Sequence, residues 1–370
     1  MNTTRAFAAK AGVTLASVIL GASAFAGLLY EPGSYAAQDH LVLQLDGIRN
    51  AGALKAHDGA ATAWVDLKSD GRSAAIRAIS SISGRSVPAT SLQDGTAGWT
   101  DDGYYFDGVT IMQMSDALTL GNTYTIQVVC DVDTDKLQTR FTQATGVVSE
   151  GGLQWPGFVG TTDTDGKDYC NIYYNCGSGQ QKVNAKMGTT NFDPVFVTKA
   201  AWNNRYLTAW SSGSEVSLFD GAAVGTTTSK NLAVGKRTLT FGASYGSTTY
   251  GAWRRSLVGT IKAVRIYDAA LSDEQLAANR ALDDARFFNG IPVTNVVVAA
   301  NIDGVEANEG CGAYAFDAEG YTFTAPAQVT NGNGIFECTG YTLQTWNGSA
   351  WGSPVSHDGE LECALSDTSA

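Results

Sequence analysis

Residues 259–276 read GTIKAVRIYDAALSDEQL, and this stretch decides the fold. Its first half is rich in β-branched and aromatic residues, which favour a β-strand. Ser272 is a typical helix-capping residue, and Gln275 stands where its side chain can reach back to the cap. Leu271 and Leu276 have the spacing of a hydrophobic staple. The stretch therefore predicts a strand that leads directly into a capped helix.

That helix should run to about Phe287, because Asn289-Gly290 and Pro292 follow it. Upstream, strand-like runs recur between turn signals through residues 40–267, and no long helical period appears there. The expected strands are Leu41–Leu45, Trp64–Leu67, Tyr104–Val109, Tyr124–Val132, Val195–Thr198, Arg205–Trp210, Glu215–Asp220 and Thr238–Gly242. We predict an all-β fold, a two-sheet antiparallel jelly-roll sandwich with one short closing helix and a small C-terminal β domain.

Three passages resemble the laminin-G-like, concanavalin-A-like jelly-roll domains of secreted bacterial proteins. They are the closing strand and helix at residues 259–276, the run from Phe106-Asp107-Gly108 through Leu118 to Ile126, and the hairpin Val216–Gly221. The resemblance covers residues 39–289, although the opening strands follow it loosely and Asp220-Gly221 replaces the commoner Asn-Gly turn. It implies a jelly-roll scaffold that often holds calcium at a sheet edge, and a binding rather than catalytic role.

The N-terminus has the form of a secretory signal peptide over residues 1–26. Arg5 and Lys10 precede an apolar stretch from residue 11 to residue 22, and Ala24-Phe25-Ala26 fits a cleavage site. An uncleaved membrane anchor is the alternative, although the apolar stretch is short for a span. We expect a protein that is secreted or at the cell surface, with no membrane span after signal cleavage and a linker at residues 27–38.

Beyond Pro292 the composition changes to short strands, which predict a small β module at residues 290–370. The expected strands are Asn295–Ala299, Tyr321–Ala325, Ile335–Gln344 and Trp351–Val355. Either Leu361–Leu365 closes this sheet, or the module is truncated at Ala370.

The charge balance excludes one class of partner. The chain carries 24 Lys and Arg against 36 Asp and Glu, a formal net charge of −12, whereas nucleic-acid binding needs clustered cations. We therefore expect no nucleic-acid partner, and the overall charge favours a neutral or cationic ligand.

The six cysteines fall three in each body, so they cannot all pair within their own body. Cys170 and Cys176 are our best expectation for a local disulfide, with buried free thiols as the alternative. No C-x-x-C motif accompanies the three histidines, which argues against a zinc site.

The carboxylates do not form a glycosidase pattern. Such enzymes hold two carboxylates about 5 Å apart, commonly on one strand, but Glu150, Glu215 and Glu274 are scattered. We therefore expect no enzyme, with a polysaccharide hydrolase or lyase as the less favoured alternative.

Two aspartate clusters are candidate calcium sites. Asp163, Asp165 and Asp168 share the D-x-D-G start of calcium loops, and an ordinary Asp-Gly turn is the alternative. For Asp131, Asp133 and Asp135 we favour a solvated turn, with a calcium ligand set or a catalytic pair as alternatives. Calcium is the one cofactor that these clusters allow.

Aromatic residues beside polar ones are the candidate ligand contacts, because sugars stack on aromatic rings while polar groups bind their hydroxyls. The candidates are Trp155, Tyr173, Tyr174, Trp202 and Trp253, each of which could instead belong to the core. Arg254-Arg255 could meet an acidic sugar, or be a solvated pair. The sequence thus predicts a non-catalytic module that binds an extracellular glycan or cell-surface component, with a structural surface-protein spacer as the alternative.

Overall fold

The structure is a computed structural model of the 370-residue chain. It describes residues 35–52, 57–69, 71–79, 93–145, 154–162, 170–177, 181–188, 195–219, 223–228, 233–243, 255–288, 294–298, 312–316, 321–324, 328–331, 334–337, 340–343, 353, 355–359 and 362–365. The expected signal peptide and most of the expected linker lie outside these residues. Residues 37–280 form one compact unit, and residues 1–36 with 281–370 form a second.

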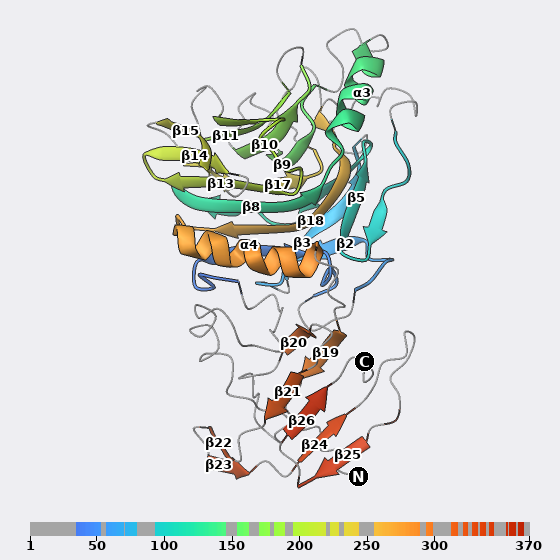
Figure 1. The fold of residues 1–370 in the computed structure, drawn as a ribbon, viewed down its shortest axis with the longest axis vertical. Helices are drawn as coiled ribbons and strands as arrows, with labels where there is room; N and C mark the ends of the chain where they lie inside the picture. Colours follow the sequence, from blue (N-terminus) through green and yellow to red (C-terminus); the bar gives the residue numbers. More distant parts are fainter. Residues whose placement is uncertain are drawn as a thin grey trace. The chain divides into compact units, whose positions relative to one another are not determined.

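The larger unit is a sandwich of two antiparallel sheets (Figure 1). Sheet A has the strand order β15 (Ala223–Thr228), β14 (Glu215–Phe219), β13 (Tyr206–Ser212), β8 (Thr123–Asp131), β18 (Val258–Tyr267), β5 (Gly103–Asp107) and β4 (Gly98–Thr100), and β1 (Leu41–Asp46) also pairs with β18. Sheet B has the order β12 (Val195–Thr198), β11 (Lys182–Met187), β10 (Cys170–Asn175), β9 (Gly157–Thr161), β17 (Leu239–Phe241), β6 (Thr110–Met114), β3 (Ser73–Ala78) and β2 (Ala63–Val65). A short ribbon of β7 (Leu118–Leu120) and β16 (Gly235–Arg237) accompanies them.

One apolar core fills the space between the sheets. Sheet A contributes Ile126 and Val128 from β8, and sheet B contributes Ile172 and Phe241, all of them buried in one cluster. These residues alternate along their strands with residues that face outward, as the period of two along a strand requires. The expected all-β, two-sheet antiparallel fold is confirmed, and each of the eight strands expected in residues 40–267 falls on an observed strand.

Helix α4 (Asp273–Phe287) begins as the sequence predicts. The Ser272 amide donates to Gln275 Oε1 at 2.9 Å, and the Gln275 amide donates to Ser272 Oγ at 3.3 Å, which together are a capping box. Leu271 is buried and Leu276 packs in the same small cluster, which is the expected staple.

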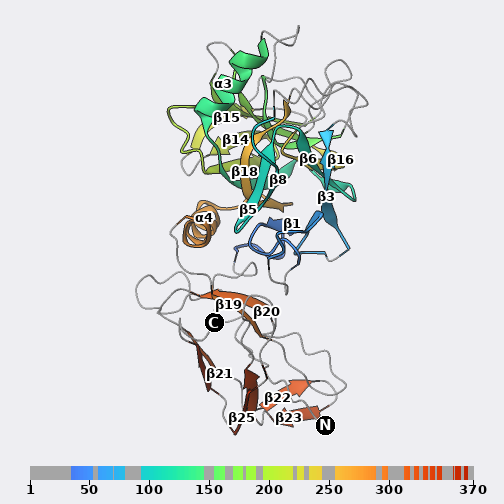
Figure 2. The same ribbon diagram turned by 90° about the vertical axis from the view of Figure 1, so that its right-hand side faces the viewer.

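This helix lies along the outside of sheet A, and Figure 2 shows it nearly end-on. Asn279 Nδ2 donates to Gln127 Oε1 on β8 at 2.9 Å and to the Tyr267 hydroxyl at 3.0 Å. The Arg280 guanidinium lies 3.9 Å from the centroid of the Tyr206 ring on β13. The outer face of sheet A is therefore occupied by the chain itself along β13, β8 and β18.

A second helix, α3 (Thr134–Thr145), corrects the expectation that residues 40–267 contain no helix. Asp133 caps it, because its Oδ1 accepts the amides of Asp135 at 2.9 Å and Lys136 at 3.0 Å. The helix buries Leu137 and the guanidinium-bearing Arg140 rather than a continuous apolar stripe. Leu137 and Phe141, one turn apart, are the apolar residues that pack on the core, and two such residues make only a weak helix signal in the sequence.

In the smaller unit the described strands form four antiparallel pairs. They are β19 (Thr294–Val298) with β20 (Gly312–Phe316), β21 (Tyr321–Thr324) with β26 (Glu362–Leu365), β22 (Gln328–Asn331) with β23 (Gly334–Glu337), and β24 (Gly340–Leu343) with β25 (Val355–Asp358). The expected strand at Leu361–Leu365 pairs with β21, whereas the expected run Ile335–Gln344 divides into β23 and β24.

Candidate functional site

The outer face of sheet B around β10 is the candidate site. Along β10 the buried side chains of Cys170, Ile172 and Tyr174 belong to the core cluster. Strand alternation therefore turns the other three side chains, Asn171, Tyr173 and Asn175, to the opposite face. These are amide and phenol groups, and they lie on the sheet that α4 does not cover.

The strand register places further polar residues beside them. On β11, Asn184 pairs with Tyr173, Lys186 pairs with Asn171, and Lys182 pairs with Asn175. Directly opposed side chains in an antiparallel pair have their Cβ atoms about 4.5–5.5 Å apart. On β12, Phe196 pairs with Asn184 and continues the row, and its ring is 44% exposed.

Trp155 joins this row from the segment before β9. The Tyr174 amide donates to Pro156 O at 2.8 Å and the Cys176 amide donates to Gln154 O at 2.9 Å, so the ladder continues past the end of β9. Trp155 consequently lies opposite Asn175, on the same face. The half-buried indole has the Arg255 guanidinium 5.5 Å from its ring, within the range of a cation–π contact.

We call this set of side chains the outer B face. Its members are Trp155, Asn171, Tyr173, Asn175, Lys182, Asn184, Lys186, Phe196 and Arg255.

Two amide oxygens of the outer B face are buried without a hydrogen-bond donor. Asn171 is 2% exposed and Asn184 is 0% exposed, and neither Oδ1 atom has a hydrogen-bond partner in the described part of the chain. The Asn184 Nδ2 donates to Lys182 O at 3.2 Å, which fixes the orientation of that amide. A buried acceptor that lacks a donor costs about 1–3 kcal/mol, so such groups call for an explanation.

The charge of this face is opposite to that of the whole chain. Strands β9 to β12 contain no Asp or Glu. They carry Lys182 and Lys186, and Arg255 lies at the Trp155 ring. The Lys182 ammonium lies 4.0 Å from the centroid of the Phe196 ring, so a cation and an exposed aromatic ring stand together.

Of the five predicted aromatic contacts, the structure brings Trp155 and Tyr173 together and separates two others. Tyr174 and Trp202 are buried in the core with their rings 6.1 Å apart, so neither can stack on a ligand in solution. Trp202 Nε1 donates to Tyr206 O at 3.0 Å, and burial raises the pKa of Tyr174 to about 12. Trp253 lies outside the described residues.

The expected Cys170–Cys176 disulfide is wrong, because both cysteines are free and buried. Cys170 begins β10 and Cys176 follows its last residue. Six residue steps of about 3.3 Å put their Cα atoms roughly 20 Å apart, whereas a disulfide needs less than about 7 Å. The alternative of buried free thiols holds for these two residues and for Cys130.

In the described residues the aspartates are not arranged as ligands of a metal ion. Asp133 caps α3, Asp135 forms an ion pair with Lys199, and Asp131 ends β8. Within those residues no group of three His, Cys, Asp or Glu side chains is suited to hold a metal ion. Asp163, Asp165 and Asp168 lie outside them, so calcium binding stays a prediction.

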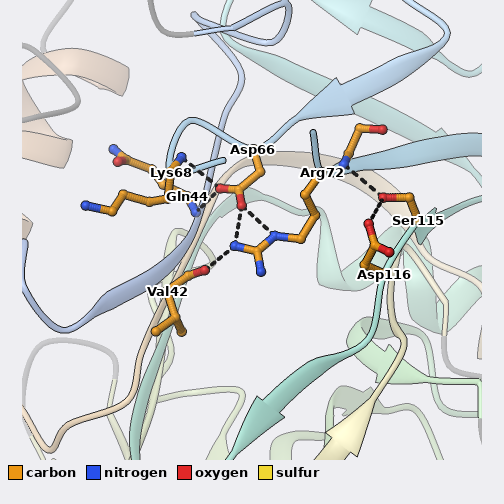
Figure 3. Close-up of polar contacts among 8 residues, drawn as sticks. Val42, Gln44, Asp66, Lys68, Arg72, Ser115 and Asp116 are labelled. Carbon is orange, nitrogen blue, oxygen red and sulfur yellow. Dashed lines mark hydrogen bonds and ion pairs between the residues drawn. The ribbon is translucent and has the colours of Figure 1, made fainter. Parts of the chain in front are cut away.

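A second polar cluster, at Asp66 between β2 and β3, differs from the outer B face because its carboxylate is fully occupied (Figure 3). Asp66 is buried; its Oδ1 accepts the Gln44 amide at 2.9 Å and the Lys68 amide at 3.1 Å. Its Oδ2 accepts Arg72 Nε at 2.7 Å, and Arg72 also bonds to Val42 O. These bonds join β1 to the β2–β3 turn, which is a structural role.

Sequence reasoning missed the amides and lysines of the outer B face. The signal was the period of two in CNIYYN and KVNAKM, where Cys170, Ile172 and Val183 mark the buried side. Neither run is among the strands expected from the sequence, which predicts a local Cys170–Cys176 disulfide there instead.

The fold and this face define a class of two-sheet antiparallel β-sandwich with an aromatic, amide-rich sheet face. No family model matches the chain. No curated protein matches it significantly either.

Solved structures give distant likenesses to accessory and carbohydrate-binding β-sandwich domains. Domain 4 of AbnA, an extracellular arabinanase from Geobacillus stearothermophilus solved with arabinotriose, is 14% identical over 65% of this chain and 97% of that chain, with a TM-score of 0.40. The CBM40 domain of Ruminococcus gnavus IT-sialidase, bound to α2,3-sialyllactose, is 14% identical over 43% of this chain and 82% of that chain, with a TM-score of 0.31. Trypanosoma rangeli sialidase with sialic acid is 13% identical over 65% of this chain, with a TM-score of 0.40, and the match covers 32% of that longer chain.

Proposed function

We propose that the chain is a non-catalytic carbohydrate-binding or adhesion module, exported from the cell and built on a laminin-G-like jelly-roll scaffold. The observation that carries this proposal is the outer B face, where aromatic rings stand beside two buried amide oxygens to which no described residue donates. Sugars present apolar C–H faces and many hydroxyl donors, so they match both kinds of group. None of the helices described has the length and apolar character that a membrane span requires.

The rings and the amides have separate tasks in this proposal. Tyr173 and Trp155 offer flat surfaces on which a sugar ring stacks, and Phe196 extends the row on β12. The Oδ1 atoms of Asn171 and Asn184, to which no described residue donates, accept hydroxyl hydrogens once the side chains that bury them move aside. A calcium ion at the predicted Asp163, Asp165 and Asp168 loop would stabilise the module.

The test is a glycan array probed with the full chain, with and without calcium. We expect a reproducible hit, and titration calorimetry with that glycan should show at least about tenfold weaker binding for Tyr173→Ala, since loss of a stacking ring costs about 1.4 kcal/mol. Phe196→Ala should also weaken binding. Val355→Ala is the matched control, because Val355 is 56% exposed and lies in the other unit.

If the chain binds no glycan on a broad array at high protein concentration, the proposal is refuted and the alternative of a structural surface-protein spacer is favoured. Binding that survives Tyr173→Ala and Phe196→Ala unchanged would place the site away from the outer B face. Hydrolysis or cleavage of the bound polysaccharide would overturn the non-catalytic part of the proposal.

A further inference from the structure

The outer B face concentrates cations in an acidic protein. The chain has a formal net charge of −12, yet strands β9 to β12 carry no acidic residue and two lysines. Unlike charges attract within about the Debye length of 8 Å at physiological ionic strength, so the lysines of these strands act on a ligand that binds against them. The local charge therefore argues for an anionic ligand, although the overall charge favours a neutral or cationic one.

The two lysines lie beside the amides that lack donors. Lys182 and Lys186 are two residues on either side of Asn184 along β11, so all three side chains leave the same face of the strand. Lys186 also pairs with Asn171 across the sheet. A ligand whose hydroxyls reach either amide oxygen is therefore within reach of an ammonium group.

The cations are placed beside rings as well as amides. Lys182 lies over the Phe196 ring and Arg255 over the Trp155 ring, at opposite ends of the row. Each of these two rings thus holds a cation at the outer B face. A ring for the sugar, an acceptor for its hydroxyls and a cation for its acid group thus occur together.

We infer that the outer B face selects glycans that carry a carboxylate, such as uronic acid polymers, over their neutral counterparts. This inference rests on the proposed function and specifies its ligand class. The carboxylate forms charge-assisted hydrogen bonds with Lys186 or Lys182, and these are roughly twice as strong as neutral ones. Hydroxyls of the same sugar donate to Asn171 and Asn184, which distinguishes a glycan from an acidic peptide.

The experiment compares oligogalacturonate with its fully methyl-esterified form, which has the same ring and no charge. We expect the full chain to bind oligogalacturonate at least about tenfold more tightly, and the preference to shrink as sodium chloride is added. The double variant Lys182→Met, Lys186→Met should lose the preference and keep the weaker binding of the ester. Lys186→Arg should retain it, and Lys236→Met, at an exposed lysine of β16, is the matched control.

Failure of this inference and failure of the proposed function give different results. Equal binding of the acid and the ester overturns the inference and leaves glycan binding intact. Failure to bind either, together with silence on the glycan array, overturns the proposed function itself. Equally tight binding of poly-glutamate overturns the inference in favour of an acidic protein partner, since a peptide lacks the hydroxyls.

Discussion

Replacing Asp66 with asparagine should destabilise the sandwich strongly while leaving its shape unchanged. The carboxylate is buried and accepts three hydrogen bonds, from the backbone amides of Gln44 and Lys68 and from Arg72 Nε at 2.7 Å (Figure 3). It also forms an ion pair with Arg72, whose Nη2 lies 2.5 Å from Oδ2. Asparagine has the same shape, but it is neutral and presents an NH₂ group to donors. The Arg72 guanidinium then loses its counter-charge in a site from which water is largely excluded.

The size of the effect follows from this burial. Breaking a buried ion pair by changing one partner costs about 3–5 kcal/mol, a large share of the roughly 5–15 kcal/mol that holds a domain folded. For a unit of this size each kcal/mol shifts the melting temperature by about 2–4 °C, so we expect a decrease of roughly 6–20 °C. Exposed ion pairs contribute about 0–1 kcal/mol, so a decrease of this size reports burial.

The assay is thermal and urea unfolding of the full chain, followed by tryptophan fluorescence. Asp116→Asn is the matched control, since Asp116 is exposed and accepts one hydrogen bond, from Ser115; it should stay within about 0.5 kcal/mol of the parent. In a double-mutant cycle with Arg72→Met the two changes should couple by more than about 1 kcal/mol. Melting of Asp66→Asn within 2 °C of the parent would refute the reasoning.

Two further predictions concern a glycine and the buried thiols. Gly108 has a φ of +87°, and a Cβ there would lie 2.1 Å from Arg140 Nη2. Gly108→Ala should therefore lower the unfolding free energy, measured in urea, by roughly 2–4 kcal/mol. The control is Gly59→Ala, whose Cβ meets nothing within 4 Å. Burial raises the pKa of the Cys170 and Cys176 thiols from 9.0 to about 12, so the folded chain holds protons that the unfolded chain releases. The stability that the protonated thiols contribute should be full below pH 9 and fall from pH 9 toward pH 12. The urea midpoint should fall less steeply with pH in a Cys170→Ala, Cys176→Ala variant. An equally steep fall of the midpoint in parent and variant would contradict this.

The closing strand and helix were predictable because their signals are local. The capping box and the staple of α4 lie within six residues, Leu271 to Leu276, and both form as the sequence indicates. Helix α3 was not predictable in the same way. Its buried residues include Arg140, which donates to Ser256 O and Gly108 O at 3.0 Å each, and these partners are distant in sequence. In the sequence, an arginine that will be buried cannot be told from a solvent-exposed one, because its acceptors come from distant segments.

The candidate site shows the same limit. Tyr173 and Tyr174 are neighbours, and a period of two requires that they face opposite sides, but the sequence does not tell which side is the core. The packing of sheet B on sheet A decides it, and the residues that complete this core are distant in sequence. The same strand also explains the wrong disulfide, because a loop between Cys170 and Cys176 would bring them together and an extended strand keeps them apart.

The two sheets differ in how their outward-facing buried amides are hydrogen-bonded. On sheet A the buried amide of Gln127 also faces outward, and α4 satisfies it, since Asn279 donates to its Oε1 at 2.9 Å. On sheet B the buried amides of Asn171 and Asn184 face outward, and nothing in the described residues donates to their Oδ1 atoms. Buried polar groups are retained where they are satisfied or where they serve a site. Because the described residues supply a donor for the amide of sheet A and none for the two amides of sheet B, the proposed function assigns the donors on sheet B to a ligand.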